Sequence, residues 1–151
     1  MNDQPVVSAA VPRPRLPADA LLQVRRTRWS EDLLVVSAAG EIDLATAGHL
    51  ERALWDDLPA ATVLDLTDVS FLGVAGLRVL EAAANRAHVE RRTVGIVAST
   101  RLVMRLLRLF DVDVRIPVYR YLPDAVRELP KLRNRPAAAT WKAPFSAPAG
   151  E

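Results

Sequence analysis

The chain has 151 residues, half of them hydrophobic and a quarter charged, which is typical of a globular domain with a sizeable core. It contains no cysteine and two histidines, which excludes disulfides and thiolate chemistry and leaves few ligands for a metal. The net charge is +2, but residues 130–151 hold four basic residues against one acid, and residues 1–20 are neutral. Residues 21–129 therefore carry a slight negative charge, and direct nucleic-acid binding by the folded part is not expected.

The two ends of the chain differ in composition from its middle. Residues 1–20 contain four prolines among small and polar residues, and residues 130–151 combine proline, alanine and scattered basic residues. Neither segment can bury enough apolar surface to fold alone, so we expect a disordered leader and a disordered tail around one domain at 21–129. No apolar run approaches the roughly 20 residues of a membrane span. We therefore expect a cytoplasmic protein with neither signal peptide nor membrane insertion, and no cofactor.

The first half of the domain reads as a hairpin followed by a helix. Residues 21–27 and 33–39 alternate as strands around a polar turn, and Gly40 is expected to end the second strand. Asp43 is expected to cap a helix by accepting from the N–H groups two and three residues on, and Pro59 stops that helix. The apolar residues at helical spacing are Leu44, Ala47, Leu50, Leu54 and Leu58.

The central feature of the sequence is V-L-D-L-T-D-V-S-F-L-G-V-A-G-L, residues 63–77. It predicts a buried strand, a short turn and the start of a helix whose stripe contains Val74, Leu77, Leu80, Ala84 and Ala87. The amino end of a helix presents unpaired N–H groups and can hold an anion or a phosphorylated side chain. The loop over 72–76 carries no acid, hydroxyl or base, so these residues perform no covalent chemistry.

The second half continues the alternation. A strand is expected at 93–98, then a helix capped by Ser99 with Leu102, Leu106 and Leu109 or Phe110 inward. A last strand at 114–119 contains Pro117 and is expected at a sheet edge. A final helix begins near Pro123 and runs to about residue 129. The pattern predicts an α/β fold with a mixed sheet of four to five strands, about four helices and right-handed crossovers, the helices largely on one face.

This order of elements, together with G-E-I-D-L-A-T-A (40–47) and residues 63–77, resembles the STAS domain family, in particular the anti-sigma-factor antagonists. The resemblance covers about residues 21–129, and it implies a regulatory binding module rather than an enzyme. It also implies partner switching with an anti-sigma factor of the serine-kinase/ATPase type. In those antagonists the turn reads F-x-D-S-x-G-L, and the kinase phosphorylates the serine and so abolishes binding, because a phosphate adds about −1.5 to −2 charge.

Position by position, this chain matches part of that turn but lacks its acidic residue and its phosphorylated serine. Phe71, Gly76 and Leu77 match the family pattern, whereas Gly73 stands at the acidic position and Val74 at the phosphoacceptor serine. Val74 is therefore a degenerate phosphoacceptor position, and the chain is expected to bind its partner independently of phosphorylation. The resemblance also places Asp43 near that position. Asp111 replaces a helix-ending glycine, and aspartate tolerates the left-handed conformation expected there.

The resemblance implies that the partner-binding residues are Asp43, Thr46, Gly73, Val74, Ala75 and Gly76, with no metal site. Two alternatives stay open: a STAS scaffold subunit of a signalling or transport complex, and, from another class, a nucleotide-binding protein or enzyme. Against the last stands the absence of a glycine-rich phosphate loop with lysine and of a paired nucleophile and base. Nothing in the sequence fixes the oligomeric state.

Several further residues have both a structural and a functional interpretation. Thr67 and Ser70 are the nearest substitute phosphoacceptors, although turn chemistry explains them equally well. Asp65, in an apolar strand, needs a partner such as an arginine or a loop N–H. Arg101, Arg105 and Arg108 form a stripe that is either a solvated helix face or an anion site. The aromatic residues that could mark an interface are Trp29, Trp55 and Trp141.

Overall fold

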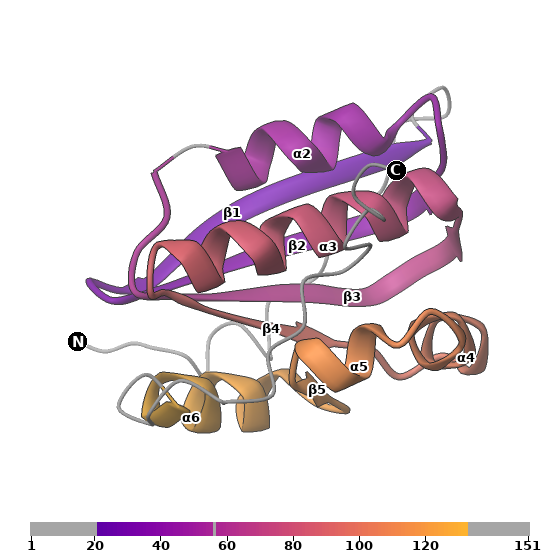
Figure 1. Cartoon of the computed structure of the whole chain (residues 1–151). Coiled ribbons are helices and arrows are strands. Elements are labelled where there is room, and N and C mark those ends of the chain that lie inside the picture. Colours follow the sequence, from indigo (N-terminus) through magenta and orange to yellow (C-terminus); the bar gives the residue numbers. More distant parts are fainter. Residues whose placement is uncertain (1–20, 56, 133–151) are drawn as a thin grey trace, which may run out of the picture.

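One five-stranded sheet organises the part of the chain that the computed structural model describes, residues 21–55 and 57–132 (Figure 1). The strands lie in the order β1-β2-β3-β4-β5. The first pair is antiparallel and the other pairs are parallel, so the predicted mixed α/β sheet is confirmed. The predicted leader, Trp141 and nearly all of the predicted tail lie outside the described residues.

The amino-terminal hairpin consists of β1 (Leu22–Ser30) and β2 (Leu33–Ile42). The hairpin was predicted correctly, but the expectation that Gly40 ends the second strand was wrong. Gly40 has a φ of 115°, and the register of β2 against β3 shifts between Gly40 and Glu41. Glycine adopts this conformation without steric cost, so it allows a bulge and the strand continues to Ile42.

Helices connect β2 and the three strands that follow it in parallel, β3 (Ala61–Leu72), β4 (Thr93–Val97) and β5 (Val118–Tyr119). The connecting helices are α2 (Ala47–Trp55), α3 (Val74–Val89), α4 (Arg101–Leu109) and α5 (Val112–Arg115). The predicted strand over 114–119 is shorter than expected, because a helical turn buries Val112 and Ile116 together at i, i+4 spacing. β5 does lie at the sheet edge, as was predicted from Pro117, which directly precedes this strand in the structure.

The sheet has a core on each face. The larger core packs β2, β3 and β4 against α2, α3, α4 and α5, and it includes Val36, Leu64 and Leu80. The smaller core packs β2, β3 and β4 against α6 (Leu122–Leu132) through Leu33, Val63 and Leu129. Figure 1 shows α2 and α3 together on one side of the sheet and α6 on the other. Most helices thus share one face, as predicted.

Two helices depart from the sequence prediction in their limits or rotation. α6 starts with Pro123 in its first turn, as expected, but passes through Pro130 because Leu132 also packs against the smaller core. In α4 the cap is Thr100, whose hydroxyl accepts from the Val103 N–H at 3.3 Å, and not Ser99. Its buried residues are Val103 and Leu107. Of the predicted inward set, Leu106 is half-buried and packs against the larger core, whereas Leu102, Leu109 and Phe110 are exposed, so that part of the prediction was wrong. None of the helices in the described ranges is both long and apolar enough to cross a membrane.

Candidate functional site

The two turns that the sequence singled out meet at the carboxyl edge of the sheet. The Gly73 N–H, in the turn between β3 and α3, donates to the Ile42 carbonyl at the end of β2 at 2.8 Å. Gly76 packs so closely on the same residue that a Cβ atom there would lie 2.6 Å from Ile42 Cγ2 and 2.6 Å from Leu72 Cδ1. The hydroxyl of Ser70 adds a bond to the Gly40 carbonyl at 3.2 Å. The two turns therefore form one structural unit.

The turn between β2 and α2 is held by reciprocal hydrogen bonds. Asp43 Oδ1 accepts from the N–H groups of Ala45 and Thr46 at 2.9 and 3.0 Å, the two bonds that were predicted, but these bonds cap the turn that precedes α2, and the helix itself begins at Ala47. In return, the Asp43 N–H donates to Thr46 Oγ1 at 2.9 Å, and the Thr46 hydroxyl donates to the Glu41 carbonyl at 2.7 Å. Such a network fixes the turn before any partner arrives.

The turn between β3 and α3 ends at Gly73, the N-cap residue of α3. Its φ of −94° and ψ of −178° are extended values that any residue adopts, and no side chain caps the helix. Val74 is the first residue of α3, and its side chain is 55 % exposed. Phe71, at the end of β3, is 45 % exposed, with Cε2 of its ring 3.2 Å from the position of a Cβ atom on Gly73. An apolar surface thus surrounds the amino end of α3.

The structure divides the six predicted site residues into two groups. Asp43, Gly73, Val74 and Ala75 are at least partly exposed, whereas Thr46 and Gly76 are buried and hold the turns in shape. Leu44 was expected to face the core but is 88 % exposed, because the Asp43 turn delays the start of α2 to Ala47. Sequence reasoning therefore missed Leu44 and Phe71 as surface residues. We call the exposed set the turn surface, and it comprises Asp43, Leu44, Phe71, Gly73, Val74 and Ala75.

A family profile described as "Mlab, STAS domain" matches residues 26–123, which span both turns and all five strands but for the first residues of β1. The chain belongs to the STAS domain family. It is 37 % identical over 95 residues to the anti-sigma-F factor antagonist RsfB of Mycobacterium tuberculosis, an alignment covering 61 % of this chain and 77 % of RsfB.

Solved structures support the same STAS fold. The crystal structure of an anti-sigma factor antagonist from Mycobacterium paratuberculosis is 34 % identical, with a TM-score of 0.69 over 76 % of this chain and 99 % of that one. The Bacillus cell fate determinant SpoIIAA in its phosphorylated form is 8 % identical, with a TM-score of 0.56 over 70 % and 97 % of the two chains. The second comparison concerns the fold alone.

The hydroxyls nearest the turn surface of the STAS domain are engaged in hydrogen bonds. The Thr67 hydroxyl and N–H both donate to Oδ1 of Asp65, a carboxylate whose residue is 2 % exposed. Within the described residues, the partner of Asp65 is thus the neighbouring threonine. Ser70 is exposed, and its hydroxyl bonds across to Gly40.

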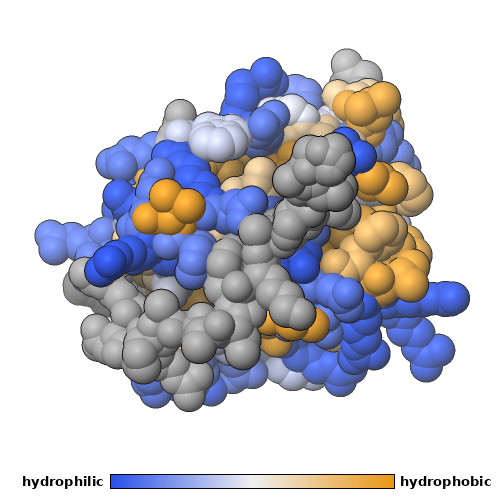
Figure 2. Space-filling model, in the orientation of Figure 1, coloured by the Kyte–Doolittle hydropathy of each residue, from blue (hydrophilic) through white to orange (hydrophobic). Residues whose placement is uncertain are grey.

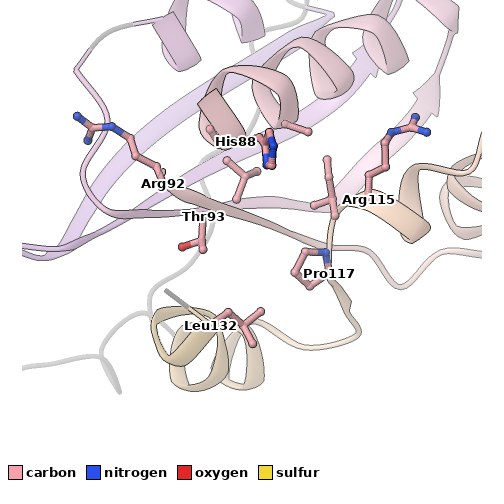
Figure 3. Close-up of a pocket in the computed structure, with 10 residues that line it drawn as sticks. His88, Arg92, Thr93, Arg115, Pro117 and Leu132 are labelled. Atoms are coloured by element: carbon pink, nitrogen blue, oxygen red, sulfur yellow. The ribbon is translucent and has the colours of Figure 1, made fainter. Parts of the chain in front are cut away.

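A cavity of about 160 Å³ lies near the end of α3 and the start of β4, lined in part by His88, Arg92, Thr93 and Arg115 (Figure 3). The two arginines point away from its centre in Figure 3 and are engaged elsewhere. Arg92 donates to the Leu58 carbonyl, and Arg115 pairs with the buried Glu81. Burial raises the pKa of Glu81, although Arg115 and Arg78 both act to lower it. Among the described residues, these two arginines therefore do not converge on the cavity to hold an anion.

The two histidines and the two described tryptophans lie in separate places and form no further site within the described residues. No cluster of metal-ligating side chains occurs within residues 21–55 and 57–132, where His49 lies on α2 and His88 on α3. Trp29 packs against the smaller core. The guanidinium of Arg86 lies 4.7 Å from the centroid of Trp55, an arrangement that joins α3 to α2.

Proposed function

We propose that this STAS protein is an anti-sigma-factor antagonist that binds a serine-kinase anti-sigma factor through the turn surface without regard to phosphorylation. Its similarity to RsfB supports the class of partner. The rigid turns support binding with little rearrangement, since Asp43 and Thr46 already satisfy one another. The protein would act in the cytoplasm, as a binding module and not as an enzyme.

The observation that carries the proposal is Val74 at the first position of α3. This is the position at which the resembling antagonists carry the serine that is phosphorylated. Val74 has no hydroxyl, and neither have Gly73, Ala75 and Gly76. The kinase therefore has no acceptor in this turn, and the phosphate charge that would break the interface cannot be installed.

Valine in place of serine also favours the complex energetically. The side chain of Val74 is half exposed in the free protein, so a partner can still remove about half of its apolar surface from water. Fully burying a valine contributes about 1.5 kcal/mol, so the remaining gain is about 1 kcal/mol. Phe71 and Leu44 are further exposed apolar residues on the two joined turns, and Asp43 is a partly exposed polar residue there.

A phosphorylation assay tests the proposal directly. The protein is incubated with ATP and each serine-kinase anti-sigma factor of its source organism, and the tryptic peptide that ends at Arg78 is analysed by mass spectrometry. Wild type should stay unmodified, whereas a Gly73→Asp, Val74→Ser double variant should gain one phosphate on the new serine. The matched control Gly73→Asp, Val74→Ala should gain none. Phosphate on Thr67 or Ser70 of the wild type would overturn the proposal.

The second candidate function is a scaffold subunit of a signalling or transport complex. It is favoured by the description of the matching family profile as "Mlab, STAS domain", which does not refer to an antagonist. A scaffold would use the same turn surface in a permanent assembly. Purification of a stable complex that contains no kinase would support this candidate against the first.

A further inference from the structure

Helix α4 exposes apolar residues that the fold does not cover. Val103 and Leu107 face the core, but Leu102 is 45 % exposed and Leu109 is 69 % exposed. The apolar surface continues past the helix into α5. Figure 2 shows hydrophobic surface gathered on the right-hand side of the molecule, the side on which Figure 1 places α4 and the start of α3. We call the exposed set the α4 ledge, and it comprises Leu102, Leu109, Phe110 and Val114.

A basic stripe runs beside the ledge. At about 100° per residue, Leu102 and Leu109 fall between the buried side of α4 and the side that carries Arg101, Arg105 and Arg108. All three arginines are exposed. Around the axis of α4, the side that faces the core is thus followed by the apolar ledge and then by the basic stripe. An apolar strip flanked by charged residues is the pattern by which two amphipathic helices pair side by side.

The arginines of the basic stripe are not paired with an acidic residue in the described part of the chain. The sequence of α4, R-L-V-M-R-L-L-R-L, contains no acid, and its three arginines make no ion pair or hydrogen bond within the described part of the chain. On other helices the arginines are paired: Arg86 with Glu90, and Arg127 with Asp124. Three unpaired positive charges beside exposed leucines point to an acidic occupant.

Charge also distinguishes between the molecules that could bind to this surface. A second copy would place arginine against arginine, and the chain's own residues 133–151 are themselves net basic. An anionic membrane would attract the arginines but would be repelled by Asp111 and Asp113, which are exposed beside Phe110 and Val114. A partner helix, in contrast, can carry a basic residue opposite these two aspartates.

We propose that the α4 ledge and its basic stripe form a second docking surface, for an amphipathic helix of a partner protein with leucine-type residues along one face and acidic residues beside them. This surface is distinct from the turn surface and needs no phosphorylated residue. The leucines of the partner helix pack on Leu102 and Leu109, and its carboxylates pair with the arginines as guanidinium–carboxylate forks.

The test uses a designed helical peptide of about 18 residues, long enough to cover α4, with leucines on one face and glutamates beside them. A twin peptide carries lysine for each glutamate. Binding to the full-length protein is followed by fluorescence anisotropy at low and high salt. The glutamate peptide should bind at least about tenfold more tightly than the lysine twin, and salt should weaken it.

Two variants assign the binding to the ledge. A triple Arg101→Glu, Arg105→Glu, Arg108→Glu variant should reverse the preference between the peptides, and Leu102→Ser with Leu109→Ser should weaken both. All five side chains are exposed, so the fold is expected to persist, and circular dichroism checks this. Equal affinity for both peptides, or no binding, would overturn the proposal. Stronger binding to phosphatidylcholine–phosphatidylglycerol vesicles than to the peptide would overturn it in favour of a membrane.

A further variant keeps this proposal separate from the function proposed for the turn surface. Val74→Ser leaves α4 unchanged and should bind the glutamate peptide as the wild type does. Loss of peptide binding in this variant would show that the two surfaces are one, and would contradict a separate docking surface.

Discussion

Replacing Gly76 by alanine tests the contact that joins the two turns of the candidate site. The added Cβ would lie 2.6 Å from Ile42 Cγ2 and from Leu72 Cδ1, side chains that are almost fully buried and have little room to move. Overpacking of this kind costs about 1–3 kcal/mol. Alanine returns up to about 1 kcal/mol of helix propensity. The free energy of unfolding should therefore fall, by up to about 2 kcal/mol.

Urea denaturation measures this loss, and Gly48→Ala provides the matched control. Gly48 also lies in the first turn of a helix, but nothing lies within 4 Å of an added Cβ atom there. Gly48→Ala should therefore stabilise the protein, by up to about 1 kcal/mol. If Gly76→Ala proved as stable as Gly48→Ala, the close packing of the two turns would be refuted.

Three further predictions concern the turn, the buried acid and the rotation of α4. Asp43→Ala should lower the free energy of unfolding by about 1 kcal/mol, because two capped N–H groups lose their acceptor. Asp43→Asn should retain most of the wild-type stability, and urea titration distinguishes the two variants. Glu81 has a raised pKa in the folded state, so its contribution to stability is largest at low pH and declines as pH rises through that pKa. Glu81→Gln should remove this decline in urea titrations between about pH 4 and about pH 7, and an unchanged pH dependence would contradict the assignment. Leu107→Ala should cost about 2–5 kcal/mol by thermal unfolding and Leu109→Ala less than about 0.5, and the reverse order would mean that α4 is rotated.

The sequence predicted the order of elements and the mixed sheet because hydrophobic periodicity and turn residues agree over most of the chain. The prediction from sequence was less successful where the same sequence pattern is compatible with more than one structure. Six of the nine residues of α4 are apolar, so more than one stripe has helical spacing, and the cap at Thr100 decides which one is buried. Gly40 was expected to end a strand, but glycine permits a bulge as readily as a turn.

The position of the candidate site followed from sequence, but its division into contact and support residues did not. The close approach of Gly76 to Ile42 joins segments about 30 residues apart in the chain, and the Thr46 hydroxyl is placed by the geometry of its own turn, where it donates to the Glu41 carbonyl. Periodicity along one segment cannot show such contacts. Leu44 fits the apolar stripe of α2, and only the geometry of the Asp43 turn places it in solvent.

The most direct test of the central claim is the affinity of the purified protein for a serine-kinase anti-sigma factor of its source organism, measured with and without ATP. The Gly73→Asp, Val74→Ser double variant is measured beside it. Extended backbone at Gly73 accepts aspartate, with a small movement of the half-exposed Phe71 ring. The wild type should bind equally well in both conditions, whereas the variant should be released once ATP is added. Release of the wild type by ATP, or failure of both forms to bind any such kinase, would contradict a phosphorylation-independent antagonist.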